Sequence, residues 1–460
     1  MGNNRIMTEK EAAGGKNRTV LAAVWAAALW AAFQMAAAAE MGLEGGAWYA
    51  SPCLACGMLF LLSAFALPDG VSGRMERQIR KGRKDAAADF FLASLILAAA
   101  GGGILAAALW FGAEALAAVF GPAEGAFLWR ALAPAAWMTM IQGAARGGFC
   151  GRKMGTFAGI SLLLEAAAGG IAAWLWTADG VREAVRSSLV YGTDQYGGMF
   201  AAEGAVRGFS AGTAVSLAFL LLAVFARRRK LFCGERKKSP VLLTGSALRA
   251  LVPGVLTVIS WGAVLLWEGF LYGKADAAGW GEFVRCELAV CLLAAEACSG
   301  GVYSAAALSK GKRDRRGRLA GAVRLAAIPA AAGAVLLAVF GNPLHRIFFG
   351  GESLRTGLPA ACAVSVILLS LAAVLTVSLF SLGKRGLAAA FSVTAAAVGA
   401  AAAGICQAAG LGSFGPAAAQ AAGLLWLCLS EGAALSLMTR PAKIPSAPET
   451  EVRGRSRRRR

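Results

Sequence analysis

Long apolar runs separated by short polar breaks form the main pattern along the chain. A hydrocarbon core of about 30 Å is crossed by roughly 20 helical residues, and the runs predict about a dozen such spans. Backbone groups in lipid must pair within their own segment, and strand-length alternation is absent from the runs, so the pattern favours helices. The twelve expected spans are Thr19–Met41, Ala47–Leu67, Phe90–Phe111, Phe127–Ala145, Thr156–Trp176, Gly198–Phe225, Leu248–Tyr272, Phe283–Leu308, Val323–Phe340, Leu358–Leu382, Leu387–Ala409 and Phe414–Met438.

Weak self-similarity at about half the chain length indicates two six-helix units. Gly151-Arg152-Lys153 links the fourth and fifth spans, and Gly383-Lys384-Arg385 links the tenth and eleventh. Units of six helices share one orientation in the membrane, and a substrate cavity is expected between them. The expected organisation is a cytoplasmic N-tail (1–18), an N-lobe (19–225), a basic cytoplasmic linker (226–246), a C-lobe (247–438) and a basic, disordered C-tail (439–460).

Charge changes the picture through its distribution rather than its size. The chain is 58% hydrophobic and 16% charged, which excludes an ordinary soluble domain, and its net charge is +20. Lys and Arg gather in alternate breaks, around residues 74–84, 146–153, 227–238, 310–318, 384–385 and 457–460. By the positive-inside rule these breaks and both termini face the cytoplasm of a bacterial inner membrane. The basic charge then reflects topology and contact with membrane lipids, and no nucleic-acid partner is expected.

Few residues offer catalytic or metal chemistry. Most of the ten cysteines fall inside expected spans, including the Cys53 and Cys56 pair, and the single histidine, His345, lies in an outer break. A metal site or a histidine-based triad has little to build on. No phosphate-binding loop is present either, so the sequence predicts a non-enzyme without cofactors.

Ionisable residues inside the spans are the candidate functional groups, because charge at membrane depth is costly and usually lines a cavity or is paired. Arg207 and Arg285 lie on helices expected to flank the interface between the two halves, and they are candidates for binding an anionic headgroup, since guanidinium donates in pairs to phosphate. Glu165, Glu268, Glu296 and Glu203 are candidates for binding a coupling H⁺ or Na⁺. Glu203 lies four residues before Arg207, which is also the spacing of a purely structural ion pair. Simple helix packing is the alternative for the carboxylates.

Several motifs resemble a known family. Leu67-Pro68-Asp69-Gly70-Val71-Ser72 is similar to its Pro-x-x-Val-Ser segment, and RGGFCGRKMGTFAGISLLLE, Arg146 to Glu165, matches its RGYFQG run without gaps. Phe348-Phe349-Gly350-Gly351 is similar to its Leu-Phe-Gly-Gly. The family is the polysaccharide-exporter branch of the multidrug/oligosaccharidyl-lipid/polysaccharide (MOP) superfamily, which includes stage V sporulation protein B and the lipid II flippases.

The resemblance implies a MOP/MATE-like fold of two rocking lobes around a cationic cavity that binds undecaprenyl-diphosphate-linked sugars. It adds Arg146 and Gln34 to the substrate-binding candidates. Relatives carry arginines in the first helix where this chain has Ala27 and Gln34, and an arginine in the fifth helix where it has Gly169.

Three functions follow as hypotheses. The first is a flippase for a lipid-linked oligosaccharide or peptidoglycan precursor, serving cell-wall or polysaccharide synthesis or sporulation, with cell-wall synthases as possible partners. The second is an ion-coupled exporter of small molecules or drugs. The third is a family member that has lost transport and serves as an envelope scaffold or sporulation factor, and the missing arginines favour it. An ion gradient or the membrane potential would drive either kind of transport.

Overall fold

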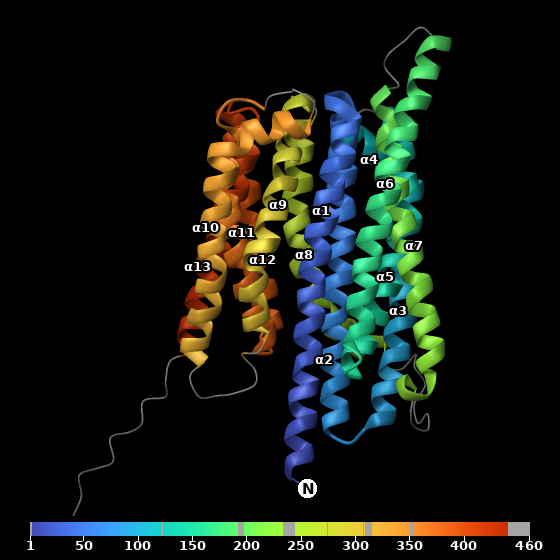
Figure 1. Ribbon diagram of the computed structural model, residues 1–460, viewed down its shortest axis with the longest axis vertical. Helices are drawn as coiled ribbons and strands as arrows, with labels where there is room; N and C mark the ends of the chain where they lie inside the picture. Colours follow the sequence, from blue (N-terminus) through green and yellow to red (C-terminus); the bar gives the residue numbers. More distant parts are fainter. Residues whose placement is uncertain are drawn as a thin grey trace, which may run out of the picture.

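The computed structural model describes residues 2–120, 123–191, 197–232, 244–273, 275–306, 308, 315–349 and 354–439, and every regular element among them is a helix. The N-terminal lobe holds α1 (Gly2–Leu61), η1 (Leu62–Ala66), α2 (Leu67–Arg80), α3 (Lys84–Phe111), α4 (Ala113–Phe120), η2 (Ala123–Gly125), α5 (Ala126–Gly151), α6 (Gly155–Tyr191) and α7 (Gly197–Leu231). The C-terminal lobe holds α8 (Thr244–Gly273), α9 (Ala277–Ala305), α10 (Arg315–Phe348), α11 (Leu358–Ser381), α12 (Arg385–Ala408) and α13 (Phe414–Met438). The two groups stand side by side in Figure 1.

The first two expected spans form one long element with a break at Gly42. Its backbone there is in the left-handed region (φ 66°), which glycine adopts without strain, and this reverses the chain between the spans. The second span continues through η1, a single π-helical turn, into α2. The π turn shifts the helical register inside the N-lobe, and short π segments of this kind often occur at functional sites.

Eleven segments in the described part of the chain are long and apolar enough to cross a membrane. Helix α5, at the place of the expected fourth span, is not among them, although its 26 residues are long enough. It packs against α2, α3, α6 and α7, so most of its surface contacts protein rather than lipid and can be polar. The predicted all-helical membrane fold is confirmed, and α5 explains why hydropathy alone finds one span fewer.

The boundaries of the expected domains differ in detail from the observed helices. Helix α1 begins at Gly2, inside the expected N-tail, and α7 continues to Leu231, inside the expected linker. Most of that linker (233–243) and of the C-tail (440–460) lies outside the described residues.

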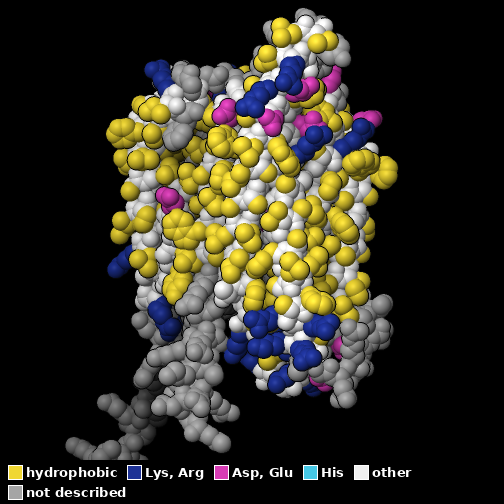
Figure 2. Space-filling view, turned by 45° about the vertical axis from the view of Figure 1, so that its right-hand side comes forward, with side chains coloured by type: hydrophobic (Ala, Val, Ile, Leu, Met, Phe, Trp, Pro, Cys, Tyr) yellow, Lys and Arg dark blue, Asp and Glu magenta, His cyan; other side chains and the backbone are white. Residues whose placement is uncertain are grey.

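Charge separates the two ends of the molecule. Lys and Arg side chains gather at the lower end of the N-lobe in Figure 2, whereas acidic and basic side chains are mixed at its upper end. The first helix starts at the lower end in Figure 1, and the positive-inside rule assigns that end to the cytoplasm. We call the lower end inner and the upper end outer.

Candidate functional site

The seam between the lobes is formed where α1, η1 and α2 pack against α8 and α9. Glycines allow the close approach. A methyl group placed on Gly254 of α8 would lie 2.8 Å from the carbonyl oxygen of Ala66 in η1, and one placed on Gly262 would overlap the side chain of Met58. Small residues let helix backbones approach within a membrane without a hydrophobic driving force.

At the outer end, Arg285 of α9 joins the C-lobe to the break in α1. The side chain is 3% exposed and its Nη2 donates to the carbonyl oxygens of Gly42 and, at 3.5 Å, Ala38. The guanidinium carbon also lies 4.7 Å from the centre of the Phe349 ring. Gly46 leaves room for the guanidinium, since a methyl group there would come within 3.1 Å of Nη2. The predicted position of Arg285 at the lobe interface is observed, with its charge directed at backbone carbonyls.

At the inner end, Asp69 of α2 forms an ion pair with Arg385 of α12. The carboxylate Oδ2 lies 2.5 Å from Nε of the guanidinium, and the two side chains are 17% and 16% exposed. Gly73 gives Arg385 its space, because a methyl group there would overlap the guanidinium. The lobes are therefore connected at both ends, by an outer latch (Arg285 with Gly42) and an inner latch (Asp69 with Arg385).

The C-lobe buries carboxylates without a cationic partner among the ion pairs described. Glu268 of α8 is fully buried, and both of its oxygens lack a hydrogen-bond donor. Glu287 of α9 accepts a hydrogen bond from Gln420 of α13 at 2.5 Å through Oε1, while its Oε2 has no donor. Glu268 and Glu287 are close enough to repel each other electrostatically. Buried oxygens that find no donor favour binding of a proton or a small cation.

A third buried carboxylate lies elsewhere in the same lobe. Glu431 of α13 is fully buried and accepts hydrogen bonds from the Thr376 hydroxyl of α11 at 3.0 and 2.9 Å. The contact joins two helices within the C-lobe, away from the residues that form the seam.

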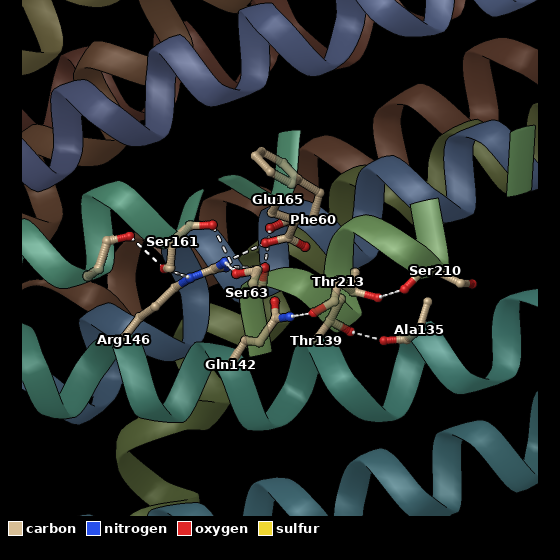
Figure 3. A network of polar contacts seen from close by, with 12 residues as sticks. Phe60, Ser63, Ala135, Thr139, Gln142, Arg146, Ser161, Glu165, Ser210 and Thr213 are labelled. Atoms are coloured by element: carbon tan, nitrogen blue, oxygen red, sulfur yellow. Dashed lines mark hydrogen bonds and ion pairs between the residues drawn. The ribbon is translucent and has the colours of Figure 1, made fainter. Parts of the chain in front are cut away.

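The N-lobe contains a closed polar cluster around Arg146, shown in Figure 3. The side chain is fully buried and forms an ion pair with Glu165 of α6. Its remaining donors reach three serine hydroxyls from three elements, Ser161 (2.9 Å), Ser63 of η1 (2.8 Å) and Ser216 of α7 (2.9 Å). The sequence places Arg146 in a basic cytoplasmic break, and this is wrong: the residue lies inside α5 with its donors directed at protein groups.

The other sequence candidates lie elsewhere. Gln34 is buried and accepts a hydrogen bond from the Tyr49 hydroxyl. Glu296 is exposed on α9. Arg207 pairs with Glu203 at 2.5 Å, but α7 packs mainly against α1, α5 and α6, so the expectation that its helix flanks the interface between the lobes is wrong. The pair instead lines a cavity of about 410 Å³ between α6 and α7.

Helix packing explains why this chain has Gly169 where the family that it resembles has an arginine. A methyl group on Gly169 would lie 3.3 Å from the Cα atom of Gly212, so the α6 and α7 backbones touch where relatives carry an arginine. A long side chain at this position has no space in the observed packing.

The structure thus brings together residues that the sequence could not pair. Glu268 gains Glu287 as a neighbouring charge, Glu287 gains Gln420 as a hydrogen-bond donor, and Glu165 gains Arg146 as an ion-pair partner. Both latches were missed as pairs, because each joins helices far apart in the chain. A signal existed for Asp69 and Arg385, since each belongs to a motif noted in the sequence, but neither motif indicates the other.

Comparison with solved structures identifies the fold. No family model and no curated protein matches the chain. The structure of an inward-facing multidrug resistance MATE family transporter of the MOP superfamily matches with a TM-score of 0.66 at 16% identity, over 92% of this chain and 94% of that one.

Two further solved structures of transporters also match the chain. The eukaryotic MATE transporter AtDTX14 matches with a TM-score of 0.63 at 14% identity, over 92% of this chain and 95% of that one. The lipid II flippase MurJ, in an inward closed conformation, matches with a TM-score of 0.60 at 12% identity, over 92% of this chain and 89% of that one. At such low identities the likeness shows the fold, so the chain has the two-lobed fold of MOP superfamily transporters.

Proposed function

We propose that this chain is an alternating-access transporter whose two lobes separate in turn at the inner and outer ends. The observation that supports this most is the pair of latches. The outer one uses Arg285 with the Gly42 carbonyl, and the inner one uses the Asp69–Arg385 ion pair. Each latch consists of few polar contacts, whereas the glycine-rich seam of η1 and α8 lies between them and can act as the pivot.

The proposed cargo is a lipid-linked oligosaccharide or peptidoglycan precursor. Its support is the motif resemblance around residues 146–165 and the shared fold with a lipid II flippase. Arg285 supplies the chemistry: when the outer latch opens, its guanidinium moves away from the Gly42 carbonyl and can donate to the cargo, and a diphosphate fits its paired donors. The wider role in envelope synthesis or sporulation belongs to the same proposal.

The proposed driving force is a cation gradient, with Glu268, Glu287 and Gln420 as the binding site for H⁺ or Na⁺. Two oxygens of Glu268, one of Glu287 and one of Gln420 are buried without a donor. Glu268 and Glu287 come from α8 and α9, the helices that form the seam, so neutralising their charge alters the packing of the helices that must move.

A small-molecule exporter is the second candidate. Glu268, Glu287 and Glu431 are buried in the C-lobe, whereas Arg285 is the one buried cation of that lobe among the described residues. An acidic interior of this kind favours cationic cargo over a diphosphate.

The test is transport by the whole protein. The chain is expressed in a bacterial host depleted of its own precursor flippases, and labelled precursor reaching the outer surface is measured. Wild-type protein should restore flipping, and Arg285→Ala should reduce it at least tenfold. The control Arg130→Ala removes an exposed outer arginine paired with Glu114 and should leave flipping unchanged.

Failure of correctly inserted wild-type protein to restore flipping would reject the lipid-linked cargo. Export of a cationic dye from proteoliposomes by the same protein would then support the exporter. Absence of both activities would leave the scaffold hypothesis.

A further inference from the structure

The outer ends of α6 and α7 enclose a groove because their backbones are in contact. A methyl group on Gly180 would lie 2.4 Å from the carbonyl oxygen of Phe200, and one on Gly204 would lie 2.3 Å from that of Trp176. Because the backbones are this close, the larger side chains next to the glycines form the two sides of the groove. The resulting cavity of about 410 Å³ is lined by Trp176, Asp179, Gly180, Glu183, Phe200, Glu203, Gly204 and Arg207.

Helix geometry places this groove at the outer surface of the membrane. The basic residues 227–230 mark the inner end of α7, and 20 residues at 1.5 Å each put the outer limit of the hydrocarbon near Arg207. Counting the same length along α6 from its start at Gly155 reaches Trp174 and Trp176, which are 44% and 42% exposed. Exposed tryptophans are typical of the membrane–water interface. The end of α6 projects beyond the other helices in Figure 1.

The charges in the groove are ordered along the membrane normal. Arg207 is nearest the hydrocarbon, and Glu203 lies one turn, about 5.4 Å, farther out. Asp179 and Glu183 lie farther out than Trp176 on α6, which runs outward, and they form exposed ion pairs with Arg182 and Arg186 on the same helix. Arg207 remains available to a ligand, since its side chain is 63% exposed although Nη2 contacts Glu203. The residues that line the groove therefore place a positive group at the hydrocarbon boundary and negative groups above it, and the paired arginines Arg182 and Arg186 lie outside the lining.

A phosphoethanolamine headgroup has the complementary order, because its phosphate is attached next to the glycerol and its ammonium extends toward water. We propose that the groove binds the headgroup of an outer-leaflet lipid that carries an ammonium beyond a phosphate. Arg207 donates to the phosphate, Glu203 and Asp179 accept from the ammonium, and the Trp176 ring lies beside the cation.

Selection against anionic lipids rests on the order of these charges. Arg182 and Arg186 offset the charges of Asp179 and Glu183, so the discriminating group is Glu203, which lies above Arg207 and accepts from an ammonium but not from a headgroup that carries phosphate alone. The site lies within the N-lobe, away from the seam, so this proposal does not depend on the cargo or on transport.

The test compares lipids retained by the whole protein. Purified protein is placed in nanodiscs of phosphatidylglycerol with a titrated fraction of phosphatidylethanolamine, and bound lipid is measured by native mass spectrometry after release. The double variant Glu203→Arg with Arg207→Glu keeps an ion pair at the same spacing but inverts the order of the charges. The control exchanges the charges of another outer ion pair, Glu114→Arg with Arg130→Glu, which lies outside the groove.

Wild-type and control proteins should retain phosphatidylethanolamine over phosphatidylglycerol, and the Glu203/Arg207 exchange should reduce that preference at least tenfold. Competition by free phosphoethanolamine would support the same chemistry with a soluble source, whereas competition by inorganic phosphate alone would overturn the ammonium assignment. An unchanged preference in the exchanged variant, or equal retention of both lipids by the wild type, would overturn the proposal.

Discussion

The Arg146–Glu165 pair offers the sharpest energetic test of the N-lobe interior. Both side chains are 1% exposed, so solvent screening is negligible. Replacing Glu165 with Leu leaves a guanidinium buried in a helical bundle with only serine hydroxyls as partners. Removing one partner of a buried ion pair costs about 3–5 kcal/mol of unfolding free energy.

The double variant Arg146→Met with Glu165→Leu should recover most of that loss. Each of the three serines also donates to a backbone carbonyl oxygen: Ser63 to Phe60, Ser161 to Ala158 and Ser216 to Ser161. Their hydroxyls therefore remain hydrogen-bonded when the arginine is removed. Because no buried charge is left uncompensated, we expect the double variant to lie within about 1–2 kcal/mol of the wild type.

The assay is reversible unfolding in mixed micelles, followed by tryptophan fluorescence. Glu114→Leu, which removes one partner of the exposed pair with Arg130, serves as the control and should cost no more than about 1 kcal/mol. A Glu165→Leu variant as stable as this control would show that Glu165 does not compensate a buried charge on Arg146. A double variant no more stable than the single one would refute the same claim.

Three further predictions concern the seam and the ion site. Gly254→Val should push α8 away from η1 and lower both thermal stability and transport, whereas Gly404→Val, at a position where an added Cβ meets no atom within 4 Å, should change neither in a melting and flux comparison. Asp69→Asn should weaken the inner latch by about 1–2 kcal/mol, as expected for a partly buried pair, and increase labelling of an inner-facing cysteine; unchanged labelling would argue against a latch. Glu268→Gln should abolish the dependence of transport on an imposed H⁺ or Na⁺ gradient while leaving the melting temperature equal or higher, because a buried carboxylate without a donor is removed; retained dependence would exclude Glu268 as the ion site.

The fold could be predicted because lipid imposes strong requirements on sequence. Apolar runs of spanning length appear wherever a helix faces lipid, and the basic breaks give the topology. Helix α5 shows the limit of this reasoning: its surface contacts other helices, so hydropathy underestimates it while the whole pattern still implies a span.

The candidate site could be predicted only one residue at a time. Arg285, Glu165 and Glu268 stand out because charge at membrane depth is costly. The groups around them do not stand out: the acceptor for Arg285 is a backbone carbonyl at Gly42, and Glu287, the charge near Glu268, receives its hydrogen bond from Gln420, an ordinary polar residue. Arg146 was misplaced because its neighbours Arg152 and Lys153 belong to a true basic turn, and sequence alone does not show where α5 ends.

Distances across the two latches test alternating access most directly. Spin labels at Glu40 and Ala278 report on the outer end, and labels at Arg80 and Gly386 report on the inner end, with all four positions outside the latch contacts. The two distances are measured in nanodiscs by pulsed electron paramagnetic resonance, with and without high Na⁺ or low pH to fill the proposed cation site. One distance should lengthen as the other shortens. Two distances that stay fixed under every condition, or that lengthen together, would contradict the account.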